Sequence, residues 1–244
     1  MVLETKAFPL DEYLDISRSL ELHASIFFKL WDMGRPIFSE EVSASAVLLD
    51  RENQLLNFAV NQEFWSNLSG YDKTFVIAHE CMHVLLKHGT RRHPLTNKMV
   101  ANVAMDIAIN HLLVNSFGFS RALLSPDLEQ KLCWVDTVFA DQTEIPPDNK
   151  AFEYYYDLLQ KLIEEPCDGQ TNINGVSGNG KEALDDLSGL EEIEKWLNEN
   201  QEAIGATKED IQKLQKKNQG IQQQQSNQPQ NAGKETHSGR SDES

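Results

Sequence analysis

The stretch TFVIAHECMHVLLKHGTRR, residues 74–92, constrains the fold more than any other part of the chain. Two histidines four residues apart, His79 and His83, interrupt a run that is otherwise almost wholly apolar. Residues four apart on an α-helix differ by roughly 40° in direction, so both imidazoles project from one face. Because the flanking residues make this helix apolar on nearly every side, we expect it to lie in the core.

A metal ion would satisfy the three polar residues of this helix, His79, Glu80 and His83, as a group, whereas burying them without partners would be costly. Zinc accepts imidazole nitrogens, and a catalytic zinc site keeps one coordination position for water. Glu80 lies beside the histidine face, where its carboxylate can take a proton from that water and pass it to a leaving amine. The order H-E-x-x-H therefore predicts a zinc-dependent hydrolase with Glu80 as general base. The alternative is a buried helix whose histidines are satisfied core residues.

A third ligand is expected from the next helix, NKMVANVAMDIAINHLL, where Asp106 interrupts an apolar pattern. Asn102 and Asn110 stand four residues before and after Asp106, so the three side chains form one stripe. A buried aspartate needs a cation or a dense shell of hydrogen bonds. We predict that Asp106 binds the metal and that Asn102 and Asn110 supply hydrogen bonds around the ligands. The alternative is that the stripe is the solvated face of the helix.

Other candidate ligands are weaker. The continuation H-E-x-x-H-x-x-G-x-x-H is absent, because Leu86 and Gly89 stand where its glycine and third histidine would be. His88 comes five residues after His83 and points roughly 140° away from it on a continuous helix, so a capping or surface role is expected. Three alternative third ligands are kept: His93, His111 and Glu153.

The strand-like runs SASAVLLD and QLLNFAV, residues 43–50 and 54–60, flank a short polar segment that suits a hairpin turn. They predict a small antiparallel sheet. Apolar spacing predicts one or two helices over residues 10–32, and further helices over 95–115 and 151–165. The expected fold class is therefore α+β, with a small antiparallel sheet packed on helices.

Helix ends can also be predicted around the histidine motif. Ser69, followed three residues later by Asp72, is a capping-box signature before the apolar run. Gly89 is expected to end that helix, because glycine suits the left-handed position after a helix. Gly118 is expected just beyond the end of the Asp106 helix for the same reason.

We interpret residues 1–166 as one domain that contains all the predicted chemistry. Residues 167–181 are polar and contain glycine, which is typical of a linker. Residues 182–217 predict an acidic amphipathic helical segment. Residues 218–244 have almost no apolar side chains and should be disordered, since they cannot bury enough surface to offset chain entropy.

The formal net charge of -16 argues against two classes of function. It disfavours sequence-independent binding to nucleic acid, and it also disfavours binding to an anionic membrane surface. The N-terminus is acidic where a signal peptide would be basic and apolar, and no run is long enough to span a bilayer, so we expect a cytoplasmic protein. Three cysteines form no C-x-x-C pair and are expected to be reduced, partly buried residues: Cys81, Cys133 and Cys167.

The run from residue 43 to 92, with NVAMDIAINHLL and AFEYYYDLL after it, resembles a known family. This is the zincin-like metallopeptidase domain that in longer bacterial proteins precedes a von Willebrand factor A-like domain. The resemblance covers roughly residues 10–165. It implies zinc as cofactor, with His79, His83 and Asp106 as ligands and Glu80 as base. The segments after residue 166 leave no room for a von Willebrand domain, so partnership with an AAA-type ATPase is not expected.

The resulting hypothesis is a zinc metallopeptidase that acts on a peptide or protein substrate. Its edge strand, assigned to QLLNFAV, would bind an extended peptide by strand addition. Tyr154, Tyr155 or Tyr156 could stabilise the oxyanion, although aromatic core packing is the simpler interpretation. Two other hypotheses stay open: an inactive zincin-like module that binds a protein partner through its edge strand and acidic C-terminal region, and a metal-free helical adaptor.

Overall fold

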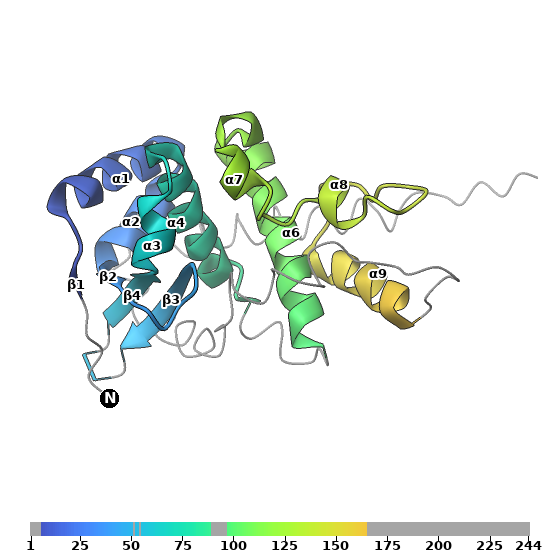
Figure 1. The fold of residues 1–244 in the computed structure, drawn as a ribbon, viewed down its shortest axis with the longest axis horizontal. Coiled ribbons are helices and arrows are strands. Elements are labelled where there is room, and N and C mark those ends of the chain that lie inside the picture. The colour runs from blue at the N-terminus through green and yellow to red at the C-terminus, as the bar shows by residue number, and fades with distance from the viewer. Residues whose placement is uncertain (1–5, 51, 54, 89–96, 165–244) are drawn as a thin grey trace, which may run out of the picture.

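The computed structural model describes residues 6–50, 52–53, 55–88 and 97–164. It combines helices with a small sheet, which confirms the α+β class (Figure 1). The predicted linker, acidic helical segment and polar tail after residue 166 lie outside the described residues, as do Gly89, His93 and Cys167.

Helices make up most of the described chain. The longer ones are α1 (Leu10–His23), α2 (Ser25–Met33), α4 (Gly70–Leu85), α6 (Lys98–Phe117) and α9 (Phe152–Glu164). The shorter ones are α3 (Gln62–Ser66), the 3₁₀ helix η1 (Arg121–Leu123), α7 (Pro126–Glu129) and α8 (Val135–Val138). The sequence predicted one or two helices over residues 10–32, and the structure has two, separated at Ala24, which is extended. Among the described helices, none is long and apolar enough to cross a membrane.

The sheet has four strands in the order β1-β2-β4-β3. Their bounds are β1 (Lys6–Ala7), β2 (Gly34–Phe38), β3 (Ser45–Asp50) and β4 (Leu55–Val60). The predicted hairpin is confirmed: β3 and β4 are antiparallel, with Ser45 opposite Val60 and Asp50 opposite Leu55.

Two expectations about the sheet were wrong. The sheet is mixed, because β2 pairs with β4 in parallel, and QLLNFAV is therefore a central strand while β3 lies at the edge. A parallel partner that is distant in the chain leaves no local sequence signal. The burial of five of the six residues of β4 is typical of a central strand.

The start of α4 was predicted correctly and its end was not. Ser69 Oγ accepts a 3.1 Å hydrogen bond from the Asp72 amide, and Asp72 Oδ2 accepts one of 3.1 Å from the Ser69 amide. This is the predicted capping box. The helix ends at Leu85 rather than near Gly89, and Lys87 adopts the left-handed conformation with a φ of 55°. The predicted left-handed cap of α6 at Gly118 is confirmed, with a φ of 73°.

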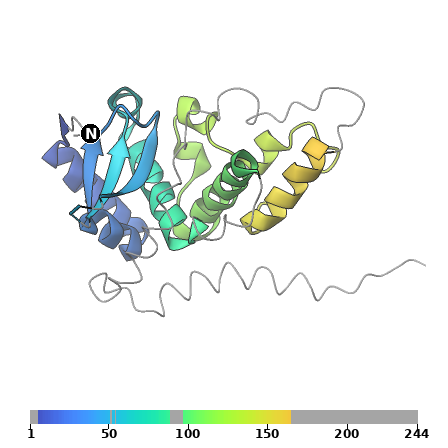
Figure 2. The same cartoon turned by 90° about the horizontal axis from the view of Figure 1, so that it is seen from below.

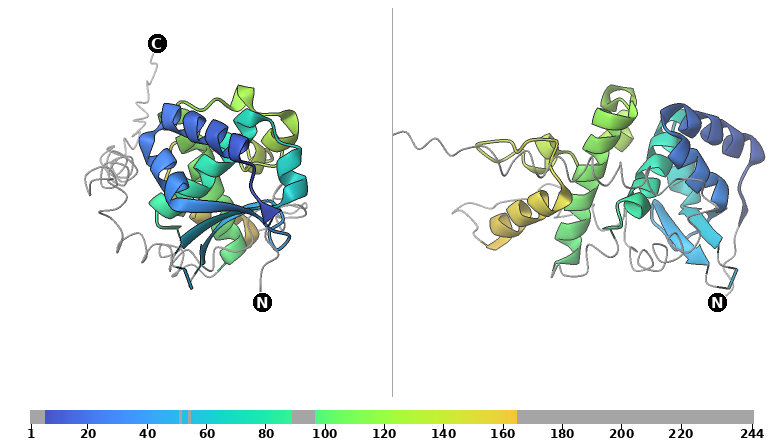
Figure 3. Two further views of the ribbon diagram at one scale, coloured as in Figure 1. Left: turned by 90° about the vertical axis from the view of Figure 1, so that its left-hand side faces the viewer. Right: turned by 180° about the vertical axis from the view of Figure 1, so that it is seen from behind.

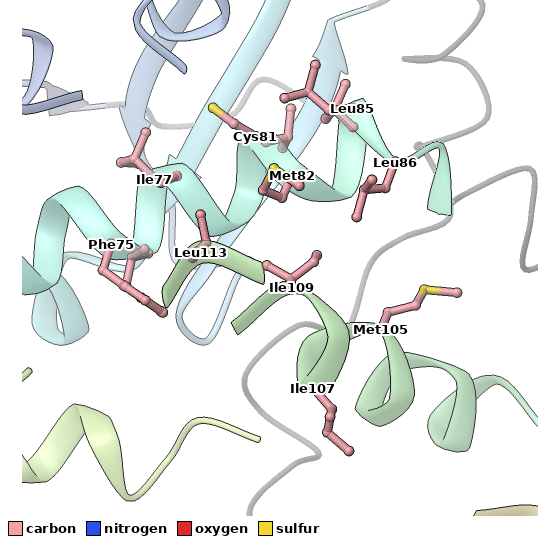
Figure 4. Packing of buried hydrophobic residues seen from close by; sticks show 14 of the residues in the cluster. Phe75, Ile77, Cys81, Met82, Leu85, Leu86, Met105, Ile107, Ile109 and Leu113 are labelled. Carbon is pink, nitrogen blue, oxygen red and sulfur yellow. The ribbon is translucent and has the colours of Figure 1, made fainter. Parts of the chain in front are cut away.

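Helix α4 lies in the middle of the molecule. It packs against β3, α1 and α2 on one side and against α6 on the other, and α6 separates it from α9 (Figures 2 and 3). Figure 4 shows Ile109 and Leu113 of α6 pointing towards α4, while Ile107 points to the opposite side. The predicted burial of the histidine helix thus holds, and its neighbour α6 carries Asp106.

Candidate metal centre

The structure brings His79, His83 and Asp106 together between α4 and α6. The two histidine Nε2 atoms are 3.0 Å apart. Asp106 Oδ1 lies 3.5 Å from His79 Nε2 and 3.2 Å from His83 Nε2. Within the part of the chain that the structure describes, this is the one group of three histidine, cysteine, aspartate or glutamate side chains that could hold a metal ion.

These separations suit a single tetrahedral ion. Zinc ligands at about 2.0–2.1 Å in tetrahedral directions are about 3.3 Å from one another. The three observed distances, 3.0, 3.2 and 3.5 Å, bracket that value. The site is also well shielded, since the side chains of His79, His83 and Asp106 are 5%, 1% and 13% exposed. Imidazole with carboxylate is a donor set that zinc accepts, so the residues present fit the metal that the sequence predicts.

The charge states of this group favour the binding of a cation. Burial by itself raises the pKa of Asp106, but hydrogen bonds and charge interactions with both histidines outweigh it and leave that pKa below its ordinary value. Burial by itself lowers the pKa of His79, but the Asp106 carboxylate outweighs it and raises that pKa. Asp106 is therefore an ionised carboxylate within a buried site. A divalent cation bound between these side chains would replace the imidazole protons as the positive charge that balances the Asp106 carboxylate.

Asn110 fixes the orientation of His79. Its Oδ1 atom lies 2.8 Å from His79 Nδ1, and its Nδ2 donates a 2.9 Å hydrogen bond to the Cys133 carbonyl. That second bond tells which end of the amide is the oxygen, so His79 Nδ1–H is the donor to Asn110. The lone pair of His79 Nε2 is then directed at the group with Asp106, as a metal ligand requires.

Asn102, the other asparagine of the predicted stripe, lies in a different environment. Its Oδ1 is buried and has no hydrogen-bond partner among the described residues. The stripe that looks uniform in the sequence is therefore divided in the structure. Asn110 reaches His79, whereas no hydrogen bond joins Asn102 to the histidines within the described chain.

Glu80 is held by a residue that the sequence did not indicate. Ser45, the first residue of β3, donates a 2.7 Å hydrogen bond from Oγ to Glu80 Oε1. Both residues are buried, at 5% and 3% exposure. The contact joins residues 35 positions apart and depends on how the sheet packs on α4, so no local pattern could have revealed it.

His88 lies in a different place from the one that the sequence predicted. It is fully buried, and its Nδ1 lies 3.2 Å from His83 Nδ1. The surface role was inferred by extending the helix through residue 88, but α4 ends at Leu85 and Lys87 is left-handed. The chain therefore turns before His88 and brings its ring back against His83.

The remaining candidates lie outside the group. His111 Nε2 accepts a 3.1 Å hydrogen bond from the Val135 amide, and burial lowers the pKa of this histidine. Glu153, on α9, is not a member of the group either. The Tyr155 hydroxyl donates 2.7 Å to the Pro147 carbonyl while its ring is fully buried, which is a packing role. Tyr156 is also buried, and Tyr154 is exposed.

The two described cysteines, Cys81 and Cys133, form no disulfide. Burial raises the pKa of the Cys81 thiol well above its ordinary value. Cys133 is partly exposed as a residue and contributes its carbonyl to Asn110. The predicted partial burial thus holds for these two residues.

Fold and site together define a class: an α+β protein in which a buried H-E-x-x-H helix and the helix after it form a group that could hold a metal ion. A family model described as "Putative metallopeptidase domain" matches residues 50–244, and the chain belongs to this family. The match begins at the last residue of β3. Comparisons with curated proteins and with solved structures give no significant match.

Proposed function

We propose that this protein is a zinc-dependent peptidase in which His79, His83 and Asp106 bind the metal and Glu80 is the general base. The observation that supports this most strongly is the convergence of three ligand atoms, at mutual separations of 3.0–3.5 Å, in a buried site. Membership of a metallopeptidase family supports the same reaction class. Two imidazoles and one carboxylate also leave one tetrahedral position open, as a catalytic rather than a structural zinc site requires.

Bound zinc would supply a Lewis acid that polarises the scissile carbonyl and lowers the pKa of a water molecule. The protein's own residues then handle the protons. Glu80 accepts the proton of the attacking water and donates it to the leaving amine. Ser45 holds Glu80 Oε1 through its hydroxyl, so the carboxylate is kept in one orientation and Oε2 is the oxygen not engaged by Ser45.

The corrected sheet order favours a different strand for substrate binding. β3 lies at the sheet edge, and its first residue contacts Glu80. An extended peptide that pairs with β3 would add a strand to the sheet and run beside the base. We therefore propose that β3, rather than β4, binds the peptide substrate.

Substitution of Glu80 tests the proposed reaction. Glu80→Gln should keep the metal and the fold, because Glu80 is not one of the three ligands and glutamine preserves its shape. Hydrolysis of a peptide library should fall by about 10²-fold or more, since general-base catalysis contributes that much. Glu63→Gln, on α3, is the matched control and should leave hydrolysis unchanged. Equal activity in the parent and Glu80→Gln would reject this base. Tight zinc binding without any hydrolysis in the parent would favour the inactive binding module.

A further inference from the structure

His83 contacts one histidine through each of its ring nitrogens. Its Nε2 lies 3.0 Å from His79 Nε2 and 3.2 Å from Asp106 Oδ1, inside the proposed metal group. Its Nδ1 lies 3.2 Å from His88 Nδ1, on the side away from that group. The proposed function uses the first nitrogen and assigns nothing to the second contact.

The chemistry of imidazole determines which nitrogen donates and which accepts in this second contact. A histidine that binds metal through Nε2 must present a lone pair there, so its proton is on Nδ1 and Nδ1–H is a donor. The atom facing His83 Nδ1–H is His88 Nδ1, which must therefore accept. His88 can accept only as a neutral imidazole with its own proton on Nε2. One hydrogen bond thus fixes the tautomers of both rings.

The surroundings of His88 hold it in this position. The left-handed conformation of Lys87, with a φ of 55°, turns the chain so that His88 returns over the end of α4. On the far side, Phe152 at the start of α9 contacts the His88 ring edge-on, with the ring centroids 5.1 Å apart. His88 is fully buried, so water does not compete for the contact with His83. The acceptor is therefore positioned before any metal binds.

We propose that His88 is a positioning residue for the metal centre, which accepts the Nδ1–H of His83 and so directs the His83 lone pair at the metal. The inference rests on the proposed function, because it assumes that His83 is a ligand. His88 does for His83 what Asn110 Oδ1 does for His79. The two ligand histidines of α4 thus have outer partners of different chemistry, an amide oxygen and a neutral imidazole nitrogen.

The test compares two substitutions that differ in hydrogen-bonding capacity. His88→Phe fills the space with a ring that cannot accept a hydrogen bond, whereas His88→Asn places an amide oxygen near the position of Nδ1. Zinc dissociation constants of the full chain are measured by chelator competition. His88→Phe should weaken zinc binding by about 10- to 100-fold, the usual effect of losing such an outer partner, and His88→Asn should recover most of the affinity.

A second readout reports the coordination directly. The visible absorption spectrum of the cobalt(II)-substituted protein should change in His88→Phe and match the parent in His88→Asn, independently of any activity. His23→Phe is the control: His23 stacks on Phe119 with ring centroids 3.6 Å apart, and this substitution should leave zinc affinity unchanged. If His88→Phe fails to fold by circular dichroism, His88→Leu replaces it, since leucine also lacks an acceptor.

The outcomes separate this inference from the function on which it rests. If the parent binds zinc and folded His88→Phe binds it as tightly, His88 only fills space and the inference is wrong. Equal losses in His88→Phe and His88→Asn would also overturn it, because the acceptor would then be irrelevant. A parent that binds no zinc would overturn the proposed function and the inference together.

Discussion

The hydroxyl of Ser45 donates a 2.7 Å hydrogen bond to the Glu80 carboxylate, and both side chains are buried. The contact ties the edge strand β3 to the helix that carries the H-E-x-x-H motif. The hydrogen bond would thus fix the position of the proposed base, Glu80, relative to β3, the strand proposed to bind the substrate. The relationship gives Ser45 a role that differs from that of a metal ligand.

Ser45→Ala should therefore lower hydrolysis without lowering zinc affinity. Hydrogen bonds to a charged group are worth about 1.5–3 kcal/mol, so the rate should fall on the order of tenfold or more if the bond orients Glu80. Steady-state kinetics and zinc titration measure the two effects separately. Ser43→Ala, at an exposed position just before β3, is the control. Unchanged kinetics in Ser45→Ala would show that the contact does not assist catalysis.

The two asparagines of α6 should respond differently to substitution. Asn110→Ala removes the acceptor of His79 Nδ1 and should weaken zinc binding by about 10- to 100-fold. Asn102→Ala should leave zinc affinity close to that of the parent, because no hydrogen bond links Asn102 to the histidines within the described residues. Chelator competition on both variants decides this. Equal losses of zinc affinity in the two variants would show that Asn102 and Asn110 support the site equally, as the sequence suggested.

Asp72 should make stability depend on pH. Burial raises the pKa of this carboxyl, but hydrogen bonds from Ser125 and Ser69 outweigh it, so the folded pKa lies below its ordinary value. A group with a depressed folded pKa stabilises the fold above its unfolded pKa of about 3.9, and this contribution is lost as pH falls through the folded value. Asp72→Asn should lower the free energy of unfolding by about 1–2 kcal/mol at pH 7.

Urea unfolding of the metal-free protein at several pH values measures this effect. The difference between the parent and Asp72→Asn should shrink as pH falls from about 5 to below about 3. Asp127→Asn, at an exposed position of α7, is the comparison and should show a smaller difference from the parent at pH 7. A difference for Asp72→Asn that stays constant with pH would contradict the account.

Gly34 should tolerate no side chain. A Cβ atom there would overlap the ring of Phe58, a residue of the central strand that is 2% exposed. Gly34→Ala should therefore destabilise the protein by about 1–3 kcal/mol through overpacking. Gly70→Ala is the matched control, because its Cβ would meet nothing within 4 Å at the first position of α4. A melting temperature of Gly34→Ala equal to or higher than that of the parent would argue against the pairing of β2 with β4.

The features that were predictable from the sequence depend on neighbouring residues. The Ser69–Asp72 capping box, the left-handed Gly118 and the β3–β4 hairpin each arise within a few positions of the chain. The shared direction of the two imidazoles was also predictable locally, because a four-residue spacing on a helix places His79 and His83 on one face. The position of Asp106 beside the two histidines was predicted from the cost of burying a charge within an apolar helix.

The features that were missed depend on contacts between distant segments or on one backbone conformation. The parallel pairing of β2 with β4 joins two strands that have β3 between them in the sequence, so no local pattern marks it. The bond from Ser45 to Glu80 follows from that sheet's position on α4. His88 was placed at the surface because its turn depends on a left-handed lysine, a conformation that residues other than glycine seldom adopt.

X-ray absorption at the zinc edge tests the central claim, that His79, His83 and Asp106 bind the metal, most directly. The zinc-loaded parent should show two imidazole ligands with nitrogen at about 2.0–2.1 Å, additional oxygen at a similar distance, and no sulfur. In the double variant His79→Ala plus His83→Ala, that signal should disappear. A sulfur shell at about 2.3 Å in the parent, or two imidazoles that persist in the double variant, would contradict the account.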